Sequence, residues 1–400
     1  MKILVLNSGG SSVKFKFIDM PDEKVIASGG IERVGKQDAV IKYKKGSMDV
    51  KKKILPVKDH EEAIKLILSS LIDSKDGVVS SIKEIEAVGH RVVHAGEKIR
   101  NSVLIDNHVI SIIEEYSDMA PLHNPPNLIG IRYCRLLMGD VPQVAVFDSA
   151  LHRDLPDYVY IYGLPYKYYE KYGVRKYGFH GITFTYMTDA AAKLIKRPLR
   201  ELRIVSLMLG SGCTANAMKY GKSIDISTGF TPFEGLIQST RAGDTDATAI
   251  TYIMDKEKLS PKQMENILNK ESGWLGISGI SNDLREITKN VDTSYRARLA
   301  IKATAYRAKK YVGAYAAALG GMDILVFSGG IGENDCLMRS EICRGLDFLG
   351  IDMDEEKNSK LKGEGIISKE GSLVKVVVVN TDEEIVIARD TYNLLNGKKK

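Results

Sequence analysis

The sequence predicts an α/β protein built from two similar domains. Short apolar segments typical of buried strands alternate with longer segments that have helical spacing. The chain has 400 residues, which is more than a typical single hydrophobic core contains. A pattern of strand, small-residue turn and strand also occurs twice, at residues 3–19 and 203–217. Together these observations indicate two domains that share one architecture.

The repeated pattern is clearest when its two copies are compared. Residues 3–19 read ILVLNSGGSSVKFKFID, and residues 203–217 read RIVSLMLGSGCTANA. With Gly212 placed on Gly10, Cys213 and Thr214 fall on Ser11 and Ser12. The same strand–turn–strand pattern at the start of both chain halves favours a duplicated domain. A chance match between two glycine turns explains the same pattern about equally well.

The remaining elements of the first half follow from apolar spacing and from capping residues. Asp59 is a suitable N-cap, and prolines at 125 and 126 with Gly139 mark the start and end of another helix. Asp148 comes at the end of an apolar strand. The expected elements are strands at 25–31, 39–43, within 86–97 and within 143–152, and helices at 59–73 and 125–139.

In the second half, a long alanine-rich helix is expected from Tyr295 to Leu319. A strand then runs into a glycine-rich turn at residues 323–334. A buried strand from residue 375 leads through Thr381 and Asp382, as caps, into an amphipathic helix. We expect residues 1–150 with 383–400 to form the first domain, closed by this last helix, and residues 151–382 to form the second.

Composition narrows the class of protein. Hydrophobic residues make up 44% and charged residues 27%, and the net charge of +6 suits a small anionic substrate. We expect the lysine runs at 51–53 and 398–400 to be solvated, and we expect no nucleic-acid partner. Four scattered cysteines without a CxxC pair indicate neither a disulfide framework nor a zinc site. No signal pattern and no membrane-spanning segment are visible, so a cytoplasmic location is expected.

Three glycine-rich turns follow predicted strands, at residues 8–12, 210–214 and 329–334. Small residues let backbone N–H groups surround phosphate oxygens. Any one of these turns alone is more often structural, but three of them in an α/β protein favour nucleotide binding. None has the P-loop spacing GxxxxGK[ST], and GGIGEN lacks the dinucleotide spacing GxGxxG.

Charged side chains near these turns are candidates for chemistry. Asp148 and the pair Glu383–Glu384 end or follow strands, where carboxylates suit Mg²⁺, although caps and helix-start acids are the ordinary explanation. Arg91 and Arg241 suit a carboxylate or phosphate, or form surface ion pairs. His123 and His180 stand in Gly/Pro-rich turns, which favours a site over a structural histidine. These residues are His123 in APLHNPP, His180 in YGFHGIT, Arg91 in GHRVVHAGE and Arg241 in STRAGDTD.

Many motifs, in order along the chain, resemble the acetate kinase family. They are NSGGSSVKF, GHRVVHAGE, APLHNPPNLIGI, VAVFDSALH, YGFHGIT, DISTGFTPFEGL, TRAGDTD, FSGGIGEN and EEIVIARDT, and they extend from Lys2 to about Leu395. The resemblance implies two domains of the actin-like ATPase (ribonuclease H-like) fold with a nucleotide cleft between them. It implies reversible transfer of a phosphoryl group from ATP to acetate, giving acetyl phosphate and ADP. It further implies Mg²⁺, with Mn²⁺ as an alternative, and a homodimer.

The resemblance also assigns roles to residues at matching positions. Asp148, Arg91, Arg241, His180 and His123 match catalytic positions, and Arg91 also matches a substrate-binding one. Asn7 and Glu384 match the metal site. The implied pocket for the substrate methyl group consists of Val93, Leu122, Phe179 and Pro232. The implied nucleotide contacts are Ser12, Lys14, Met208, Leu209, Gly210, Ser211, Gly212, Asp283, Leu284, Arg285, Gly330, Ile331, Gly332, Glu333 and Asn334.

Departures from the family pattern gather around the phosphate-binding turns. They are Gly10, Met208, Ser211, Phe184, Ala247 and Asp382, where the family has serine, histidine, asparagine, histidine, proline and asparagine. These changes leave three alternatives open. The chain acts on propionate or another short-chain acid, it uses a phosphoryl donor other than ATP, or it is a catalytically weakened nucleotide-binding paralogue.

Overall fold

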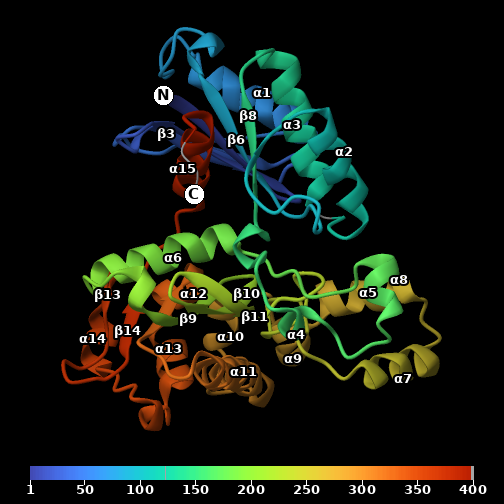
Figure 1. Ribbon diagram of the computed structural model, residues 1–400, viewed down its shortest axis with the longest axis vertical. Coiled ribbons are helices and arrows are strands. Elements are labelled where there is room, and N and C mark those ends of the chain that lie inside the picture. The colour runs from blue at the N-terminus through green and yellow to red at the C-terminus, as the bar shows by residue number, and fades with distance from the viewer. Residues whose placement is uncertain (122, 398–400) are drawn as a thin grey trace. The chain divides into compact units, whose positions relative to one another are not determined.

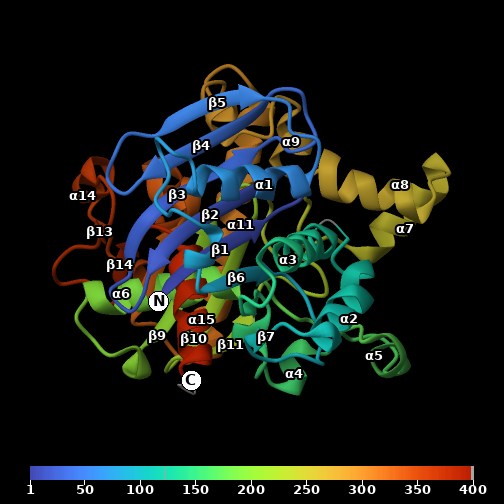
Figure 2. The same ribbon diagram turned by 90° about the horizontal axis from the view of Figure 1, so that it is seen from above.

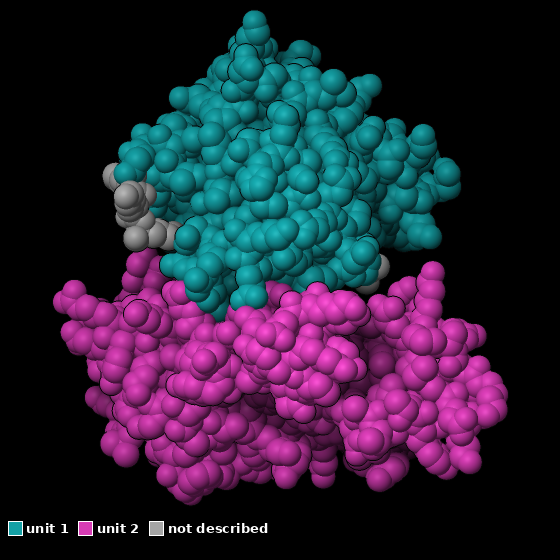
Figure 3. Space-filling model, turned by 45° about the vertical axis from the view of Figure 1, so that its right-hand side comes forward, with its two compact units in different colours: residues 1–153, 382–400 teal, residues 154–381 magenta. Residues whose placement is uncertain are grey.

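The computed structural model of the protein describes residues 1–121 and 123–397. The chain divides into two compact units, residues 1–153 with 382–400 and residues 154–381, which Figure 3 colours separately. Each unit has its own sheet and its own hydrophobic core. The two units are therefore described one after the other.

Unit 1, residues 1–153 with 382–400, is built on an eight-stranded mixed sheet in the order β5-β4-β3-β2-β1-β6-β8-β7. Strands β1, β6 and β8 are parallel neighbours at its centre, and β1 to β5 form an antiparallel meander. The strands are β1 Lys2–Ser8, β2 Ser12–Asp19, β3 Lys24–Glu32, β4 Ala39–Lys45, β5 Lys51–Leu55, β6 Ala87–Val92, β7 Val103–Leu104 and β8 Gln143–Phe147.

Helices cover both faces of this sheet (Figures 1 and 2). Residues of α1 and α3 join Leu4, Leu6 and Phe15 in one core cluster. On the other face α15 lies directly on β6, where a Cβ at Gly89 would come within 2.6 Å of Thr391 Oγ1, so only glycine fits. The helices are α1 His60–Leu71, α2 Asn107–Glu115, α3 Asn124–Met138 and α15 Glu383–Leu395, with 3-10 turns at Ile82–Glu84, Tyr116–Asp118 and Ala150–His152.

Unit 2 is built on a six-stranded mixed sheet in the order β11-β10-β9-β12-β14-β13. The long helix α11 packs on β9 and β10, and α6 packs against β9 and β12. Alternate residues of β9 and β10, among them Val205, Leu207 and Ala215, belong to the core cluster that contains α11. The strands are β9 Arg203–Leu209, β10 Cys213–Lys219, β11 Lys222–Ile226, β12 Ile324–Ser328, β13 Gly365–Ile366 and β14 Lys375–Val378.

Most helices of unit 2 are short, and α5, α7 and α8 extend from one side of it (Figure 1). Additional turns are 3-10 at Leu199–Glu201 and Asp347–Leu349, and a π-helix spans Ile267–Glu271. The α-helices are α4 Asp157–Tyr160, α5 Lys167–Tyr172, α6 Gly181–Leu194, α7 Ala247–Glu257, α8 Pro261–Asn266, α9 Gly273–Ser278, α10 Leu284–Thr288, α11 Tyr295–Leu319, α12 Gly329–Asn334, α13 Cys336–Cys343 and α14 Glu355–Lys360.

The two sheets share one core topology, as a duplicated domain requires. The order β3-β2-β1-β6-β8 in unit 1 corresponds to β11-β10-β9-β12-β14 in unit 2, with the same parallel and antiparallel pairs. The register corrects the expected alignment of the turns. Ser8 pairs with Val13 across residues 9–12, whereas Leu209 pairs with Cys213 across residues 210–212. The second turn is shorter, so Thr214 corresponds to Lys14 and not to Ser12.

Several expected elements differ in detail from the observed ones. The glycine-rich segment after β12 is the helix α12 rather than a turn. Asp382 is the N-cap of α15 and accepts a hydrogen bond from the Ile385 N–H, whereas Thr381 lies before the cap. The lysines at 51–53 lie in the exposed edge strand β5, where charge discourages pairing with another chain. Within the described residues, no helix has the length and apolarity needed to cross a membrane.

Candidate functional site

In unit 1, polar side chains gather where the central parallel strands end. Asn7 lies near the end of β1, Arg91 in β6 and Asp148 directly after β8, because these strands are neighbours in the sheet. The first turn of α15 brings Glu383 and Glu384 to the same place. Carboxyl ends of parallel strands are the usual position of ligand sites in α/β proteins.

Arg91 is the centre of this cluster. Its Nε and Nη2 donate to Asp148 Oδ2 at 3.1 and 2.6 Å, and its Nη1 donates to Asn7 Oδ1 at 3.0 Å. Nη1 also lies 3.9 Å from Glu383 Oε2. Burial alone lowers the pKa of Arg91, but Asp148, Glu383 and Glu384 together raise it above its ordinary value. The guanidinium is therefore a fixed positive charge held in one orientation.

Carboxylate oxygens lie around Arg91, but the described residues hold no group of three or more His, Cys, Asp or Glu side chains placed to bind a metal ion. Asp148 Oδ1 is buried and has no hydrogen-bond partner among the residues that the structure describes, so one carboxylate oxygen remains available there. The Asn7 amide donates to Glu383 Oε2 at 2.8 Å and to Glu384 Oε1 at 3.4 Å, which orients both carboxylates. Mg²⁺ in phosphoryl-transfer sites is held by one or two carboxylates together with water and phosphate oxygens. Glu383 and Glu384, both contacted by the Asn7 amide, are carboxylates of the type that such a site uses.

Lys16, which was not among the expected residues, reaches this cluster. Its Nζ lies 2.6 Å from Asp382 Oδ2 and 3.7 Å from Glu384 Oε2. Asp382 is one of the departures from the family pattern, and its added negative charge is balanced by this lysine. Lys14 lies two residues earlier in β2, opposite Asn7 in the register, and its side chain is exposed.

The start of α3 is tied to the same end of the sheet. Asn127 accepts a hydrogen bond from the Val93 N–H at 3.3 Å and donates to the Ser8 carbonyl at 2.7 Å. Val93 is buried after β6, and His123 occupies the N-cap position of α3. The backbone carbonyl of Ser12 accepts a hydrogen bond from the Gly9 N–H at 2.8 Å, which closes the first turn. Leu122, expected in the substrate pocket, lies outside the described residues.

In unit 2, His180 and the second glycine turn lie together. His180 is the residue before α6 and has φ 59°, in the left-handed region. Its Nδ1 lies 2.9 Å from Thr214 Oγ1 of β10. A Cβ added to Gly212 would lie 3.6 Å from His180 Cε1 and 3.9 Å from Nε2, so the ring edge faces the turn.

Arg241 and a buried glutamine, Gln238, both donate to the carbonyl of Pro232. Gln238 Nε2 donates to the Pro232 carbonyl at 2.9 Å, and Arg241 Nη1 donates to the same carbonyl at 3.3 Å. Burial lowers the pKa of Arg241. Phe179, also expected in the substrate pocket, is buried and its N–H donates to Thr228 Oγ1 at 3.0 Å.

Two of the expected nucleotide segments meet at the ends of β9 and β12. Gly329 begins α12 with φ 77°, and a Cβ there would approach the Leu209 carbonyl oxygen to 2.6 Å. The turn at 210–212 and the helix α12 are therefore adjacent. Arg339 of α13 fixes the far end of α12 by donating to the carbonyls of Gly332 at 2.8 Å and Glu333 at 3.0 Å.

The remaining nucleotide candidates occupy separate positions. Asp283 is the N-cap of α10 and pairs with the exposed Arg285 at 2.6 Å, while Leu284 is buried. Within α12, the Gly330 carbonyl accepts from Asn334 Nδ2 at 2.9 Å, and Ile331 packs against the core. Met208 is buried at the end of β9, and Ser211 is exposed in the turn. Phe184 is fully buried in α6, so this departure from the family serves packing.

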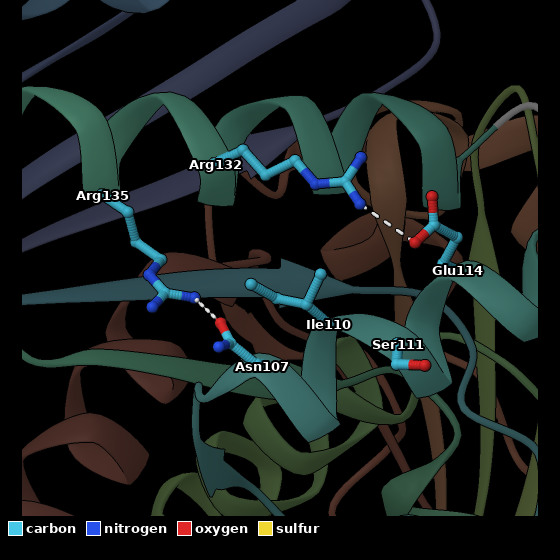
Figure 4. Close-up of a pocket in the computed structure, with 6 residues that line it drawn as sticks. All are labelled: Asn107, Ile110, Ser111, Glu114, Arg132 and Arg135. Carbon is cyan, nitrogen blue, oxygen red and sulfur yellow. Dashed lines mark hydrogen bonds and ion pairs between the residues drawn. The ribbon is translucent and has the colours of Figure 1, made fainter.

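A pocket of about 390 Å³ opens elsewhere, between α2 and α3 of unit 1 (Figure 4). Its arginines are already engaged, because Arg132 donates to Glu114 at 3.0 Å and Arg135 donates to Asn107 at 2.9 Å. None of the candidate residues lines it. We therefore assign it no part in the chemistry.

The model of the acetokinase family matches residues 2–389. The chain belongs to the acetokinase family. Family relatives named acetate kinase are 50% identical in Thermoanaerobacter pseudethanolicus, over 100% of both chains, and 51% identical in Dictyoglomus thermophilum, also over 100% of both. The crystal structure of Porphyromonas gingivalis acetate kinase is 44% identical, with a TM-score of 0.92 over 98% of this chain and 99% of that one.

A propionate kinase from Francisella tularensis shares the fold of the acetokinase family as well. It is 37% identical with a TM-score of 0.90, covering 98% of this chain and 99% of that chain. These matches confirm an α/β protein with two mixed sheets of the expected kind. Thr214, Lys16 and Gln238 were not among the expected site residues. In the sequence, Thr214 stands out as a polar residue in the buried strand β10. Lys16 stands out because it alternates with Lys14 along β2.

Proposed function

We propose that this chain is an acetate kinase, which transfers the γ-phosphoryl group of ATP to acetate and gives acetyl phosphate and ADP, reversibly. One observation carries the proposal. Residues expected for this reaction lie in hydrogen-bonded clusters at the strand ends of each unit, in a chain 50% identical over its full length to proteins named acetate kinase. It is thus proposed to be a phosphotransferase with a carboxyl group as acceptor.

The reaction is direct. A carboxylate oxygen of acetate forms a bond to the γ-phosphorus, and the bond from that phosphorus to the β,γ-bridging oxygen breaks, with ADP as leaving group. Acetate is already ionised, so no strong base is required. Two anions must approach each other, and the main task of the protein is positioning and charge stabilisation. Fixed arginines are suited to this task because they keep their charge.

Each cluster has a proposed part in the reaction. Arg91, held by Asp148 and Asn7, binds the acyl carboxylate. Asp148 keeps the guanidinium of Arg91 in one orientation, and His123 lies at the start of α3 in the same unit. His180 and Arg241 donate hydrogen bonds to the phosphoryl oxygens, where charge changes during transfer. Val93, Phe179 and Pro232 are proposed to contact the methyl group of acetate.

The nucleotide contacts are proposed to lie at the glycine-rich segments. The turn at 210–212 and α12 offer backbone N–H groups to phosphate and adenosine, and Ser12, Lys14 and the 283–285 segment supply further contacts. Mg²⁺, with Mn²⁺ as an alternative, is proposed to bind at Asn7 and Glu384, where it would supply positive charge to the phosphates. Asn7 serves it by orienting the two glutamates.

Propionate is the second candidate substrate, because a propionate kinase is among the structures that match the chain. One additional methylene in an apolar pocket changes binding by only about 1–3 kcal/mol. We therefore expect propionate to react more slowly than acetate rather than to be rejected. A weakened nucleotide-binding paralogue is the third candidate, because Gly10, Met208 and Ser211 alter the phosphate-binding turns.

Trapping acetyl phosphate with hydroxylamine tests these candidates. The full chain with ATP, Mg²⁺ and acetate should give acetyl hydroxamate, and Arg91→Ala and Arg241→Ala should abolish it. Arg132→Ala is the matched control, because Arg132 pairs with Glu114 on the surface and should keep wild-type activity. No product from the wild-type chain would refute an acetate kinase. Faster reaction with propionate, or with a donor other than ATP, would select the corresponding alternative, and nucleotide binding by calorimetry without turnover would select the paralogue.

We further propose a cytoplasmic homodimer. Tyr158, Leu164, Tyr166, Tyr168 and Tyr172, in α4, α5 and the segment between them, are exposed. Tyrosine rings of this segment also touch one another: Tyr166 and Tyr169 at 5.4 Å and Tyr168 and Tyr172 at 6.4 Å between ring centroids. Exposed tyrosines are typical of interfaces. The four cysteines are free, in keeping with a reducing compartment.

A further inference from the structure

Thr214 is a buried hydroxyl residue that the assigned roles do not use. It lies in β10 with no exposed surface, and it pairs in register with Met208 of β9. Its neighbours Cys213 and Ala215 belong to the core that contains α11. Because side chains alternate along a strand, Thr214 points to the opposite face, where α6 packs and His180 lies.

The hydroxyl of Thr214 has one partner. In the described part of the chain, its Oγ1 is hydrogen-bonded only to His180 Nδ1, at 2.9 Å. A buried hydroxyl hydrogen needs an acceptor, and leaving it unmet costs free energy. Nδ1 of a neutral imidazole accepts such a hydrogen only when the ring proton is on Nε2. The contact therefore selects one of the two tautomers of neutral His180.

We propose that Thr214 is a positioning residue that holds His180 in the Nε2–H tautomer, with this N–H directed at the turn formed by Gly210, Ser211 and Gly212. The inference rests on the proposed function in one respect, namely that His180 donates to the phosphoryl group. Ring orientation supports it, because the Cε1–Nε2 edge is the edge that approaches Gly212. The opposite tautomer presents a lone pair to the phosphate, which repels it.

The local backbone fixes the geometry of this contact. The backbone of His180 has φ 59°, in the left-handed region, so its ring projects in a different direction from that of a side chain within α6. Threonine is restricted at χ1 by its branched Cβ, which keeps Oγ1 in one place. A hydroxyl also suits the task better than a carboxylate would, since a carboxylate accepts only and favours a proton on Nδ1. Thr214 thus directs the proton without adding charge.

Substitution and direct observation of the ring test the proposal. Thr214→Val removes the hydroxyl at nearly constant volume, and Thr214→Ser retains it. Thr188→Val is the control, because Thr188 is buried in α6, the helix that follows His180. Among the described residues its hydroxyl is hydrogen-bonded only within α6, to the Phe184 carbonyl at 2.8 Å and the Thr185 carbonyl at 3.4 Å. Ring nitrogen shifts of the full chain, labelled with ¹⁵N-histidine, report the tautomer, and a His180→Gln variant assigns the signal among the seven histidines.

We expect His180 to be in the Nε2–H tautomer in the wild type, in Thr214→Ser and in Thr188→Val. In Thr214→Val we expect the ring to be no longer held in that tautomer alone. We expect Thr214→Val to reduce kcat about 100-fold, with KM for ATP and acetate nearly unchanged, because the ring remains but is wrongly presented. Serine should restore most of kcat.

A proton on Nδ1 in the wild type, or a wild-type kcat in Thr214→Val, overturns the proposal. The nitrogen spectra do not depend on turnover, so they separate it from the proposed function. A protein that makes no acetyl phosphate but shows the expected tautomers refutes the function alone. If Thr214→Val does not fold, the wild-type spectrum and Thr214→Ser still decide the tautomer.

Discussion

At the scale of the residue, the candidate site of unit 1 depends on one buried ion pair. The side chain of Asp148 is 2% exposed and that of Arg91 is 16% exposed, so both charges have lost most of their water. Such pairs contribute little net stability, but breaking one leaves an uncompensated charge, which is costly. A substitution of Arg91 therefore affects both activity and stability, so the two have to be measured separately.

Arg91→Ala should lower the free energy of unfolding by about 3–5 kcal/mol, because Asp148 is left buried without its counterion. Adding Asp148→Asn should restore most of that loss, since a neutral amide is less costly to bury. Neither variant should form acetyl hydroxamate. Urea denaturation measures the stabilities.

Lys98→Ala is the control for this cycle. Lys98 pairs with Glu115 at 2.7 Å on the surface, so its removal should cost less than about 1 kcal/mol. A double variant no more stable than Arg91→Ala would contradict the interpretation that the unpaired Asp148 carries the cost.

At the scale of the element, local signals predicted helices well and long-range contacts poorly. The helix expected from Tyr295 to Leu319 is observed with those bounds, because Ser294 caps its start and Gly320 ends it. Asp59 caps α1 as expected. The contact of His180 with Thr214 could not be predicted, because it depends on how α6 packs against β9 and β12 and on a turn one residue shorter than its counterpart. Similarly, the alternation of lysines in β2 did not reveal that Lys16 reaches Asp382.

The short helix α12 should depend on Arg339 for its position. Arg339 is buried and donates to the Gly332 and Glu333 carbonyls and to Asn358. Arg339→Lys keeps the charge but cannot make all these bonds. Loss of one or two hydrogen bonds, at about 1 kcal/mol each, should raise KM for ATP roughly tenfold.

Steady-state kinetics with each substrate varied in turn measures this effect. KM for acetate should not change, because α12 is proposed to contact only the nucleotide. Arg344→Lys provides the comparison, since Arg344 pairs with Glu341 at the surface. An unchanged KM for ATP in Arg339→Lys would remove Arg339 from the nucleotide site.

His90 of β6, which is hydrogen-bonded to Gln143 of the neighbouring strand β8, predicts that the stability of the fold depends on pH. His90 is buried in β6, and burial lowers its pKa from 6.5 to about 4, against the opposing effect of its 2.7 Å hydrogen bond to Gln143. The unfolded chain takes up a proton below pH 6.5, whereas the folded one does so only near pH 4. Stability from this group is therefore complete above pH 6.5 and is lost as pH falls toward 4, by about 3 kcal/mol.

Urea denaturation at intervals from pH 7.5 to 4.5, compared between wild type and His90→Asn, measures this loss. The variant should show a flatter curve over that window, because the titrating group is gone. His108→Asn, which replaces an exposed histidine of α2, should retain the wild-type slope. Equal slopes in wild type and His90→Asn would show that other groups govern the acid side.

At the scale of the whole molecule, the two units use one core topology for different tasks. In unit 1, Lys14 of β2 pairs with Asn7 near the end of β1, beside the acid proposed for the metal site. In unit 2 the equivalent pair is Thr214 opposite Met208, beside His180. The two hairpins therefore keep the same antiparallel pairing, with a turn one residue shorter in unit 2, while their polar residues differ. Unit 2 also carries a segment with several exposed tyrosines, residues 158–172.

This segment should form the interface of the proposed homodimer. Tyr158, Tyr166 and Tyr172 are 79%, 60% and 56% exposed, which is unusual for large side chains clustered in one segment. Changing Tyr166 and Tyr172 together to glutamate buries four like charges in a two-fold interface, because each residue occurs in both copies. Sedimentation equilibrium should then show the wild type at twice the chain mass of 44.2 kDa and the double variant at one chain mass. Leu136→Glu, at a side chain 76% exposed in α3, should remain dimeric. A monomeric wild type would refute the homodimer, and a dimeric double variant would place its interface on another surface.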